Sequence, residues 1–312
     1  MQSRRRQGPD GHVSNPGTRM AGTDQHQRDV RYADALADSL PPTVTQGDSW
    51  FDYPFYLNLI DLLDRKDMWA FKRLEHSGDT MADMFGAAAM PGGWQGIDDV
   101  VGVVRAEQAS SLFVSAGGND VIAAIQGKRE YLEAILGPIA GTPPQLVVAA
   151  PDNSPPSAYV NHELWLQVLG YLRAGLARLL DKVRKRAIVY AHGYDYLVPA
   201  DKPVVVMGVN GAGPWMYPVM TGLGITRPQL QRDICAILID DFNHMLDELE
   251  EQNAPWFIHL DVRNTLGQDD WLNEIHPTKT GFGKVAKAVL AEWALKHETA
   301  EAALAVESGG GS

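Results

Sequence analysis

A β-prone run leads directly into a Gly-Asp-Ser turn in the stretch Pro42-Thr43-Val44-Thr45-Gln46-Gly47-Asp48-Ser49-Trp50. Val and Thr favour extended backbone, whereas Gly, Asp and Ser each favour turns for separate backbone reasons. A strand that ends in such a turn holds Ser49 at its end, where a serine can act as a nucleophile. Three residues form this pattern by chance in many proteins, so that role for Ser49 depends on what the rest of the chain supplies.

The chain beyond this turn alternates between apolar runs of strand length and amphipathic helical patterns. Strands are predicted at residues 70–74, 111–115, 187–191 and 256–260, and helices at 164–183, 230–249 and 280–296. Alternating strands and helices predict a parallel sheet with right-handed crossovers and helices on both faces.

Two details of this pattern add further expectations. Thr226, Pro228 and Gln229 predict a capping box at the start of the helix that follows them. Two more apolar runs, at 145–150 and 204–209, have flanks rich in Pro and Gly. We expect them to be insertions around the mouth of a site or extra strands.

Short glycine-rich or polar blocks follow the predicted strands in order along the chain. After Gly47-Asp48-Ser49 come His76-Ser77-Gly78-Asp79-Thr80, Ala116-Gly117-Gly118-Asn119-Asp120 and Asn273-Glu274-Ile275-His276-Pro277-Thr278. Ligands of open parallel sheets bind beyond the carboxyl ends of the strands. The blocks therefore predict one site at that edge of the sheet.

In this order and context, the four blocks resemble those of the SGNH hydrolases, also called the GDSL esterase/lipase family. The resemblance covers roughly residues 43–295. It implies an α/β fold of the three-layer αβα, flavodoxin-like type, with a central parallel five-stranded sheet in the order 2-1-3-4-5. It also implies that Ser49 is the nucleophile, that His276 is the general acid and base, and that Gly78 and Asn119 form the oxyanion hole with the Ser49 backbone amide.

These residue types suit acyl transfer. A serine hydroxyl is a poor nucleophile unless a base within hydrogen-bonding reach accepts its proton, and the ordinary pKa of histidine suits that task near neutral pH. The expected function is a serine esterase that hydrolyses carboxylic esters, with short-chain acyl groups, through an acyl-enzyme at Ser49. The alternatives are an acyltransferase that uses the same Ser-His site and a noncatalytic ligand-binding relative.

The sequence departs from the family pattern at the group that orients the histidine. Family members commonly carry Asp three residues before it, whereas this chain has Asn273. An Asn carbonyl can orient an imidazole but supplies no negative charge to stabilise the imidazolium. The catalytic orienting group is therefore left open between Asn273, a backbone carbonyl and four acids nearby in the sequence: Asp261, Asp269, Asp270 and Glu274.

Composition sets the expectations about partners. The 312 residues carry a formal net charge of −12, which argues against a nucleic-acid partner because such partners need a basic patch. The chain has one cysteine and lacks paired-Cys motifs and a His-Glu-x-x-His helix, so we expect no catalytic metal and no cofactor. The expected partners are a small-molecule acyl ester and water, and no oligomeric state is predicted.

One SGNH hydrolase-like domain is predicted at residues 31–298, between a disordered N-terminal tail at 1–30 and a flexible C-terminal tail at 299–312. The N-terminal tail is polar and has no apolar run of the length that a signal peptide or membrane span needs. We therefore expect a cytoplasmic location without stable membrane insertion. Aromatic residues on the predicted loops are expected to rim the cleft, namely Trp50, Phe51, Tyr53, Phe55, Trp215 and Tyr217.

Overall fold

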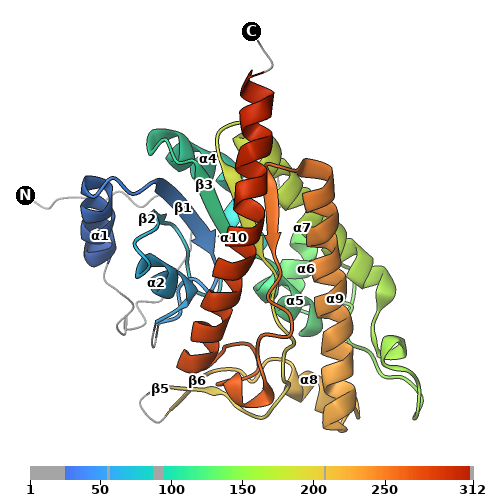
Figure 1. The fold of residues 1–312 in the computed structure, drawn as a ribbon. Helices are drawn as coiled ribbons and strands as arrows, with labels where there is room; N and C mark the ends of the chain where they lie inside the picture. The colour runs from blue at the N-terminus through green and yellow to red at the C-terminus, as the bar shows by residue number, and fades with distance from the viewer. Residues whose placement is uncertain (1–24, 55–56, 87–94, 207–208, 310–312) are drawn as a thin grey trace, which may run out of the picture.

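Five strands form one parallel sheet in the order β2-β1-β3-β4-β7 (Figure 1). The computed structural model describes residues 25–54, 57–86, 95–206 and 209–309. The sheet strands are β1 Pro42–Gly47, β2 Ala70–Arg73, β3 Ser111–Ser115, β4 Ile188–His192 and β7 Phe257–Leu260. Because β7 is the fifth strand of this sheet along the chain, the predicted order 2-1-3-4-5 is confirmed.

Helices cover both faces of the sheet. On one face α2 (Leu59–Asp64) packs against α10 (Lys279–Gly309), while α4 (Gln95–Ala106), α7 (His162–Val183) and α9 (Pro228–Asn253) pack side by side on the other (Figure 1). The connection from β1 to β2 runs one way along the sheet, and the connections from β2 to β3, β4 and β7 run the other way. Right-handed crossovers in opposite directions lie on opposite faces of the sheet. The remaining helical segments are α1 Gln25–Ala37, α3 Met81–Phe85, α5 Gly118–Ile125, α6 Arg129–Leu136, α8 Tyr217–Gly222 and the 3₁₀ turns η1 Pro156–Tyr159 and η2 Gln268–Asp270.

The long amphipathic helices lie where the apolar spacing predicts them, but the start of α9 differs from the prediction. Its N-cap residue is Arg227, which makes no side-chain capping bond, and Pro228 occupies the first turn. The predicted capping box at Thr226 is therefore wrong. Thr226 lies one residue outside the cap position, and Pro228 suits the first helical position because its missing N–H has no partner there in any case.

The apolar runs at 145–150 and 204–209 differ from each other in structure. Val204–Val206 forms β5, which pairs antiparallel with β6 (Val209–Ala212) in a separate two-stranded sheet. Residues 145–150 form no strand, and Val147 makes only an isolated bridge with Val160. The extra-strand alternative thus holds for 204–206, while 207–208 lie outside the described residues.

Helices extend into both segments that the sequence predicts as tails. Helix α1 begins at Gln25 and docks on the sheet edge through the buried Tyr32 and the 3.2 Å ion pair of Asp29 with Lys72. Helix α10 continues to Gly309, well past residue 298. Residues 1–24 and 310–312 lie outside the described ranges. Within those ranges, no helix has both the length and the apolarity needed to cross a membrane.

Candidate active site

Ser49 lies in a tight turn at the carboxyl end of β1. A Cβ atom on Gly47 would lie 2.7 Å from Ser115 Cβ, so the end of β1 packs against β3 at a distance that only glycine permits. The Asp48 N–H donates to Ser115 O at 3.1 Å, and the Trp50 N–H donates to Asp48 Oδ1 at 3.0 Å. These contacts close the turn and fix the backbone on both sides of Ser49.

The structure brings Ser49, His276 and Asn273 together. Ser49 Oγ lies 2.8 Å from His276 Nε2, and His276 Nδ1 lies 3.1 Å from Asn273 Oδ1. Asn273 Oδ1 also accepts the backbone N–H groups of Ile275 at 3.1 Å and His276 at 2.9 Å, which fixes the amide with its oxygen toward the imidazole. Nδ1 therefore carries the ring proton, and Nε2 is the nitrogen that can accept the proton of Ser49.

Three of the four acids near His276 in sequence are engaged elsewhere or exposed. Asp261 Oδ2 accepts from Arg263 Nη2 at 2.7 Å, and Asp270 Oδ2 accepts from Lys284 Nζ at 2.6 Å. Asp269 is exposed. In the described part of the chain, the side chain that faces His276 Nδ1 is thus the amide of Asn273.

Glu274, the fourth acid, organises a neighbouring loop. Its fully buried carboxylate accepts the N–H groups of Met216 at 3.0 Å and Tyr217 at 2.7 Å, and also those of Trp215 and Ala200. Burial raises the pKa of this carboxyl, although the four N–H donors oppose that effect. Glu274 therefore anchors the loop that carries Trp215 beside the histidine.

Two aromatic rings cover His276. The ring centroid of Tyr53 lies 4.5 Å from that of His276, and the centroid of Trp215 lies 5.8 Å from it. The imidazole is 5% exposed, and burial lowers the pKa of His276 to about 3. The ring is therefore neutral at neutral pH, which is the state that accepts a proton from serine.

The predicted oxyanion residues lie on adjoining segments. Gly78 has φ +93°, a left-handed conformation that favours glycine. Asn119 is the second residue of α5, and its Nδ2 donates to Asp79 O at 3.0 Å. The next residue, Asp120, accepts the Met81 N–H at 3.0 and 3.1 Å. The start of α5 thus holds the turn that contains Gly78.

A buried network beneath Ser49 is not predicted by the sequence analysis. Tyr194 donates its hydroxyl proton to Asp48 Oδ2 at 2.6 Å, and Ser115 Oγ donates to Asp48 Oδ1 at 2.9 Å. The Gly118 N–H donates to the Tyr194 hydroxyl at 3.2 Å. Burial raises the pKa of Asp48, and the hydrogen bonds from the Tyr194 and Ser115 hydroxyls oppose that effect. The network ties together the carboxyl ends of β1, β3 and β4. Asp48 and Gly118 lie in blocks that the sequence analysis singled out, but nothing in the sequence showed that Tyr194 reaches them.

An apolar pocket opens beside Ser49 and Asn119, between α5 and α9. Its other lining residues are Asp48, Trp50, Gly117, Gly118, Val121, Ile122, Tyr194, Leu197, Leu238, Ile239, Phe242 and Ile275. The loop aromatics predicted to rim the cleft differ in exposure, and of them Trp50 lines this pocket. Trp50, Phe51 and Tyr53 are buried, Trp215 and Tyr217 are partly exposed, and Phe55 lies outside the described residues. His192 is buried as well, with its ring stacked on Trp50.

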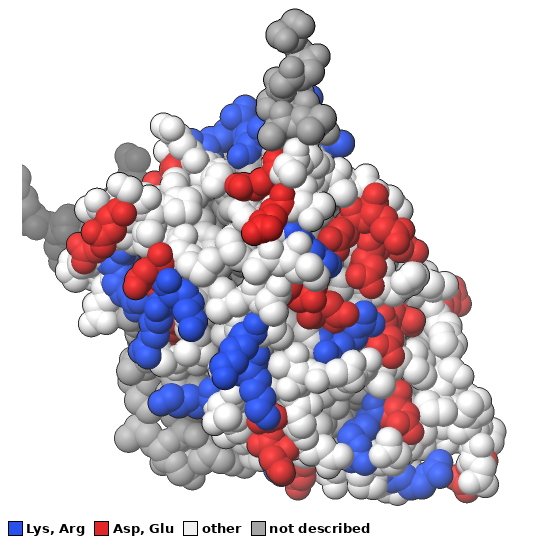
Figure 2. All heavy atoms as spheres, viewed as in Figure 1, with Lys and Arg blue, Asp and Glu red and all other residues white. Residues whose placement is uncertain are grey.

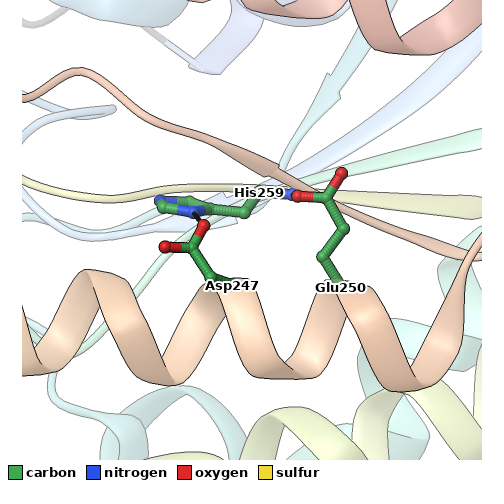
Figure 3. Close-up of side chains that lie close together, drawn as sticks. All are labelled: Asp247, Glu250 and His259. Atoms are coloured by element: carbon green, nitrogen blue, oxygen red, sulfur yellow. Dashed lines mark hydrogen bonds and ion pairs between the residues drawn. The ribbon is translucent and has the colours of Figure 1, made fainter.

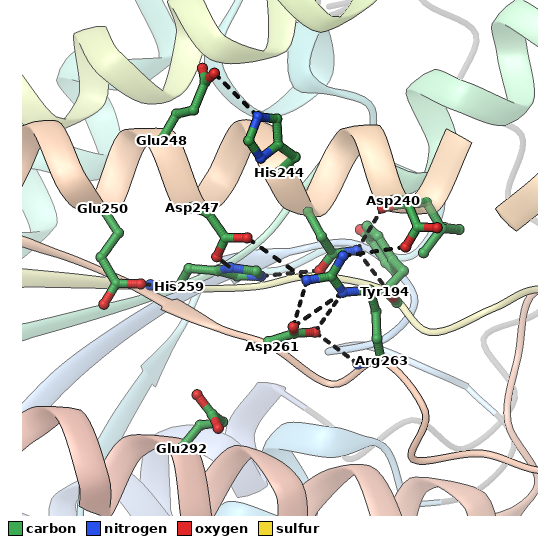
Figure 4. Close-up of polar contacts among 12 residues, drawn as sticks. Tyr194, Asp240, His244, Asp247, Glu248, Glu250, His259, Asp261, Arg263 and Glu292 are labelled. Atoms are coloured by element: carbon green, nitrogen blue, oxygen red, sulfur yellow. Dashed lines mark hydrogen bonds and ion pairs between the residues drawn. The ribbon is translucent and has the colours of Figure 1, made fainter. Parts of the chain in front are cut away.

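Acidic side chains gather over α9 with basic side chains among them (Figure 2). Asp247 and Glu250 of α9 approach His259 of β7 in an arrangement that is able to hold a metal ion (Figure 3). However, Lys296 Nζ already donates to Glu250 Oε2 at 2.8 Å. Arg263 Nη2 also lies 3.7 Å from Asp247 Oδ2, as Figure 4 shows. His259 Nδ1 itself bonds Asp247 Oδ1 at 2.7 Å. We interpret this cluster as an ion network that packs α9 and α10 against β7.

Comparison with known proteins reveals similar folds at low sequence identity. No protein-family model and no curated protein matches the sequence. An extracellular lipase from Streptomyces rimosus is 17% identical, with 80% of this chain and 98% of that chain covered and a TM-score of 0.43. A family 3 carbohydrate esterase from Clostridium thermocellum is 11% identical, with 84% and 99% covered and a TM-score of 0.40. AlinE4, an SGNH-hydrolase family esterase, is 16% identical, with 82% and 95% covered and a TM-score of 0.30.

Proposed function

We propose that this chain is a serine esterase of the SGNH hydrolase family, which hydrolyses carboxylic esters through an acyl-enzyme at Ser49. The observation that carries the proposal is the 2.8 Å contact between Ser49 Oγ and His276 Nε2 at the carboxyl edge of a parallel sheet. A nucleophile within hydrogen-bonding reach of a neutral imidazole, whose other nitrogen is oriented by a third group, is the arrangement that activates serine.

In the first half of the proposed reaction, Ser49 Oγ attacks the carbonyl carbon of the ester while His276 Nε2 takes the hydroxyl proton. The tetrahedral oxyanion accepts hydrogen bonds from the backbone amides of Ser49 and Gly78 and from Asn119 Nδ2. The bond between the carbonyl carbon and the alcohol oxygen then breaks. His276 returns its proton to that oxygen, so the alcohol leaves neutral and the acyl group stays on Ser49.

The second half repeats these steps with water. His276 takes a proton from water as its oxygen attacks the acyl carbon. The new tetrahedral oxyanion uses the same donors. When the bond to Ser49 Oγ breaks, the proton on Nε2 passes to that oxygen, which releases the carboxylic acid and regenerates the enzyme.

Asn273 is the group that we propose as the orienter of His276. Its Oδ1 accepts a hydrogen bond from the Nδ1–H group at 3.1 Å and so selects the tautomer that leaves Nε2 basic. The amide is neutral, so it gives the imidazolium formed during each half-reaction no counter-charge. We therefore expect slower turnover than a carboxylate at the same position would give.

The size of the pocket beside Ser49 favours ester substrates with a short acyl group. Its lining is apolar, with Val121, Ile122, Leu238 and Phe242 around a cavity volume of about 40 Å³. Because a single water needs about 10–15 Å³ of such space, the cavity has room for only a few heavy atoms. This favours acetyl to butyryl groups over long chains.

Hydrolysis of p-nitrophenyl esters tests the proposal. The wild-type protein should hydrolyse the acetate and butyrate faster than the octanoate, whereas Ser49→Ala should be inactive. Ser110→Ala, at an exposed serine, is the matched control and should behave as wild type. A wild type that is inert toward every chain length would instead support a noncatalytic ligand-binding relative.

A further inference from the structure

The N-terminal helix α1 reaches the edge of the candidate site through one side chain. Arg28 of α1 forms an ion pair with Asp52, which lies three residues after Ser49. The Asp52 N–H donates to Asp48 O at 3.0 Å, so Asp52 belongs to the turn that carries the nucleophile. The two side chains are 9% and 20% exposed, which shields their ion pair from much of the solvent.

Asp52 also contacts the turn that contains Gly78. While Oδ1 pairs with Arg28, Oδ2 accepts the Ser77 N–H at 3.3 Å, one residue before Gly78. Residues 76–78 are exposed, and a Cβ atom on Gly78 would meet nothing within 4 Å. The bonds from Asn119 to Asp79 O and from the Met81 N–H to Asp120 hold the far side of this turn. The Ser77 bond to Asp52 therefore matters for where the Gly78 amide points on the near side.

We propose that Arg28 is a positioning residue that acts through Asp52 to hold the Gly78 backbone amide where the oxyanion forms. This inference rests on the proposed esterase function. Oxyanion donors are effective because they are fixed before the charge develops. Without the guanidinium, Asp52 is able to turn toward water and release the Ser77 N–H. Its unpaired negative charge would also remain beside the turn that must stabilise a developing negative charge.

The other contacts of α1 attach the helix without reaching either turn. Arg31 pairs with Asp64 at 2.6 Å, and the Tyr32 hydroxyl donates to Glu107 Oε2 at 2.9 Å. Arg31 therefore provides a matched control for Arg28. It is the same residue type on the same helix and also pairs with a carboxylate, but its partner lies on α2, away from the nucleophile turn.

The test compares Arg28→Gln, Arg28→Lys and Arg31→Gln in the full-length protein, using p-nitrophenyl butyrate and thermal unfolding. Arg28→Gln should lower kcat about tenfold with KM changed less than about twofold, because the oxyanion donor is displaced rather than deleted. Arg31→Gln should keep wild-type kcat. Arg28→Gln should lower the melting temperature more than Arg31→Gln does, because its ion pair is better shielded, but should remain folded at the assay temperature. Arg28→Lys keeps the positive charge and should recover most of the lost kcat.

Three outcomes would contradict the inference or its premise. If Arg28→Gln turned over like wild type, Arg28 would have no positioning role. If both Gln variants lost kcat in parallel with their melting temperatures, α1 would act only by stabilising the fold. In either case an active wild type leaves the esterase proposal intact. A wild type that neither hydrolyses esters nor reacts with a fluorophosphonate overturns the esterase proposal itself, and this inference with it.

Discussion

Asn273 Oδ1 lies 3.1 Å from His276 Nδ1, so a neutral amide faces the histidine in the position that a carboxylate holds in a Ser-His-Asp triad. Two backbone N–H groups fix the orientation of this amide. The tautomer of His276 is therefore set by hydrogen bonding alone, without a negative charge to stabilise the protonated ring.

Replacement of Asn273 by Asp should raise the pKa of His276. Burial lowers this pKa to about 3 in the wild type, and a carboxylate at Nδ1 favours the charged ring. The general base is active only when neutral, so activity is lost as the pH falls through its pKa. In the wild type, kcat/KM should therefore begin to fall only at a pH well below the ordinary histidine pKa. In Asn273→Asp this fall should occur at higher pH. Superimposable pH profiles of the two proteins would contradict this prediction.

Removal of the Asn273 side chain should cost less activity than removal of the base. Asn273→Ala deletes the acceptor that orients the ring but leaves Nε2 within reach of Ser49, whereas His276→Ala deletes the group that accepts the proton. We expect kcat/KM to fall further in His276→Ala, measured on folded variants with matched circular dichroism spectra. Equal losses in the two variants would show that the ranking is wrong.

Replacement of Glu274 by Ala should destabilise the fold. The change leaves the N–H groups of Trp215, Met216 and Tyr217 without their acceptor. We expect the free energy of unfolding to fall by about 3 kcal/mol, since an unsatisfied buried polar group costs about 1–3 kcal/mol. Urea denaturation measures this loss.

Glu292→Ala is the matched control for Glu274→Ala. Glu292 makes a 3.6 Å pair with Lys296 on the surface of α10 and should contribute less than about 1 kcal/mol. Equal losses of unfolding free energy in the two variants would mean that Glu274 does not anchor the loop.

Asp120 should make the protein less stable as the pH rises toward neutrality. Burial raises the pKa of this fully buried carboxyl from the ordinary value of 3.8 to about 7. Between these two values the folded chain binds more protons than the unfolded chain, so the free energy of unfolding falls with rising pH. Asp120→Asn should remove this part of the pH dependence, as measured by urea denaturation at about pH 5 and about pH 8.

Asp201→Asn, at an exposed carboxyl, is the control for Asp120→Asn and should keep the wild-type pH dependence. If Asp120→Asn showed the same change in stability between the two pH values as wild type, the buried carboxyl would not titrate in this range.

The fold was predictable because its signals are local. Each strand of the sheet lies in a short β-prone or apolar stretch followed by turn residues, and Ser49, Gly78 and Asn119 each follow one of the first three strands. The order of the blocks along the chain also singled out His276 as the predicted base, although it lies 16 positions beyond Leu260, the last residue of β7. The composition of single segments and their order along the chain were therefore enough to predict the strands and the blocks that follow them.

Two contacts that the sequence did not predict join distant segments. Tyr194 reaches Asp48 across 146 residues, and Arg28 reaches Asp52 from a helix expected to be part of a disordered tail. The orienting group stayed open for a different reason: sequence spacing does not show which nearby side chain faces the histidine, although Asn273 is only three residues from His276. Asp261 is excluded by its pairing with Arg263, a contact that spacing in the sequence does not reveal.

Covalent labelling of Ser49 tests the central claim most directly. After treatment with a fluorophosphonate, the intact mass of the wild-type protein should increase by one phosphonyl group, and peptide mapping should place that group on Ser49. Ser49→Ala should show no increase, and Ser110→Ala should label as wild type does. An unlabelled wild type, or a phosphonyl group on another residue, would contradict the assignment of Ser49 as the nucleophile.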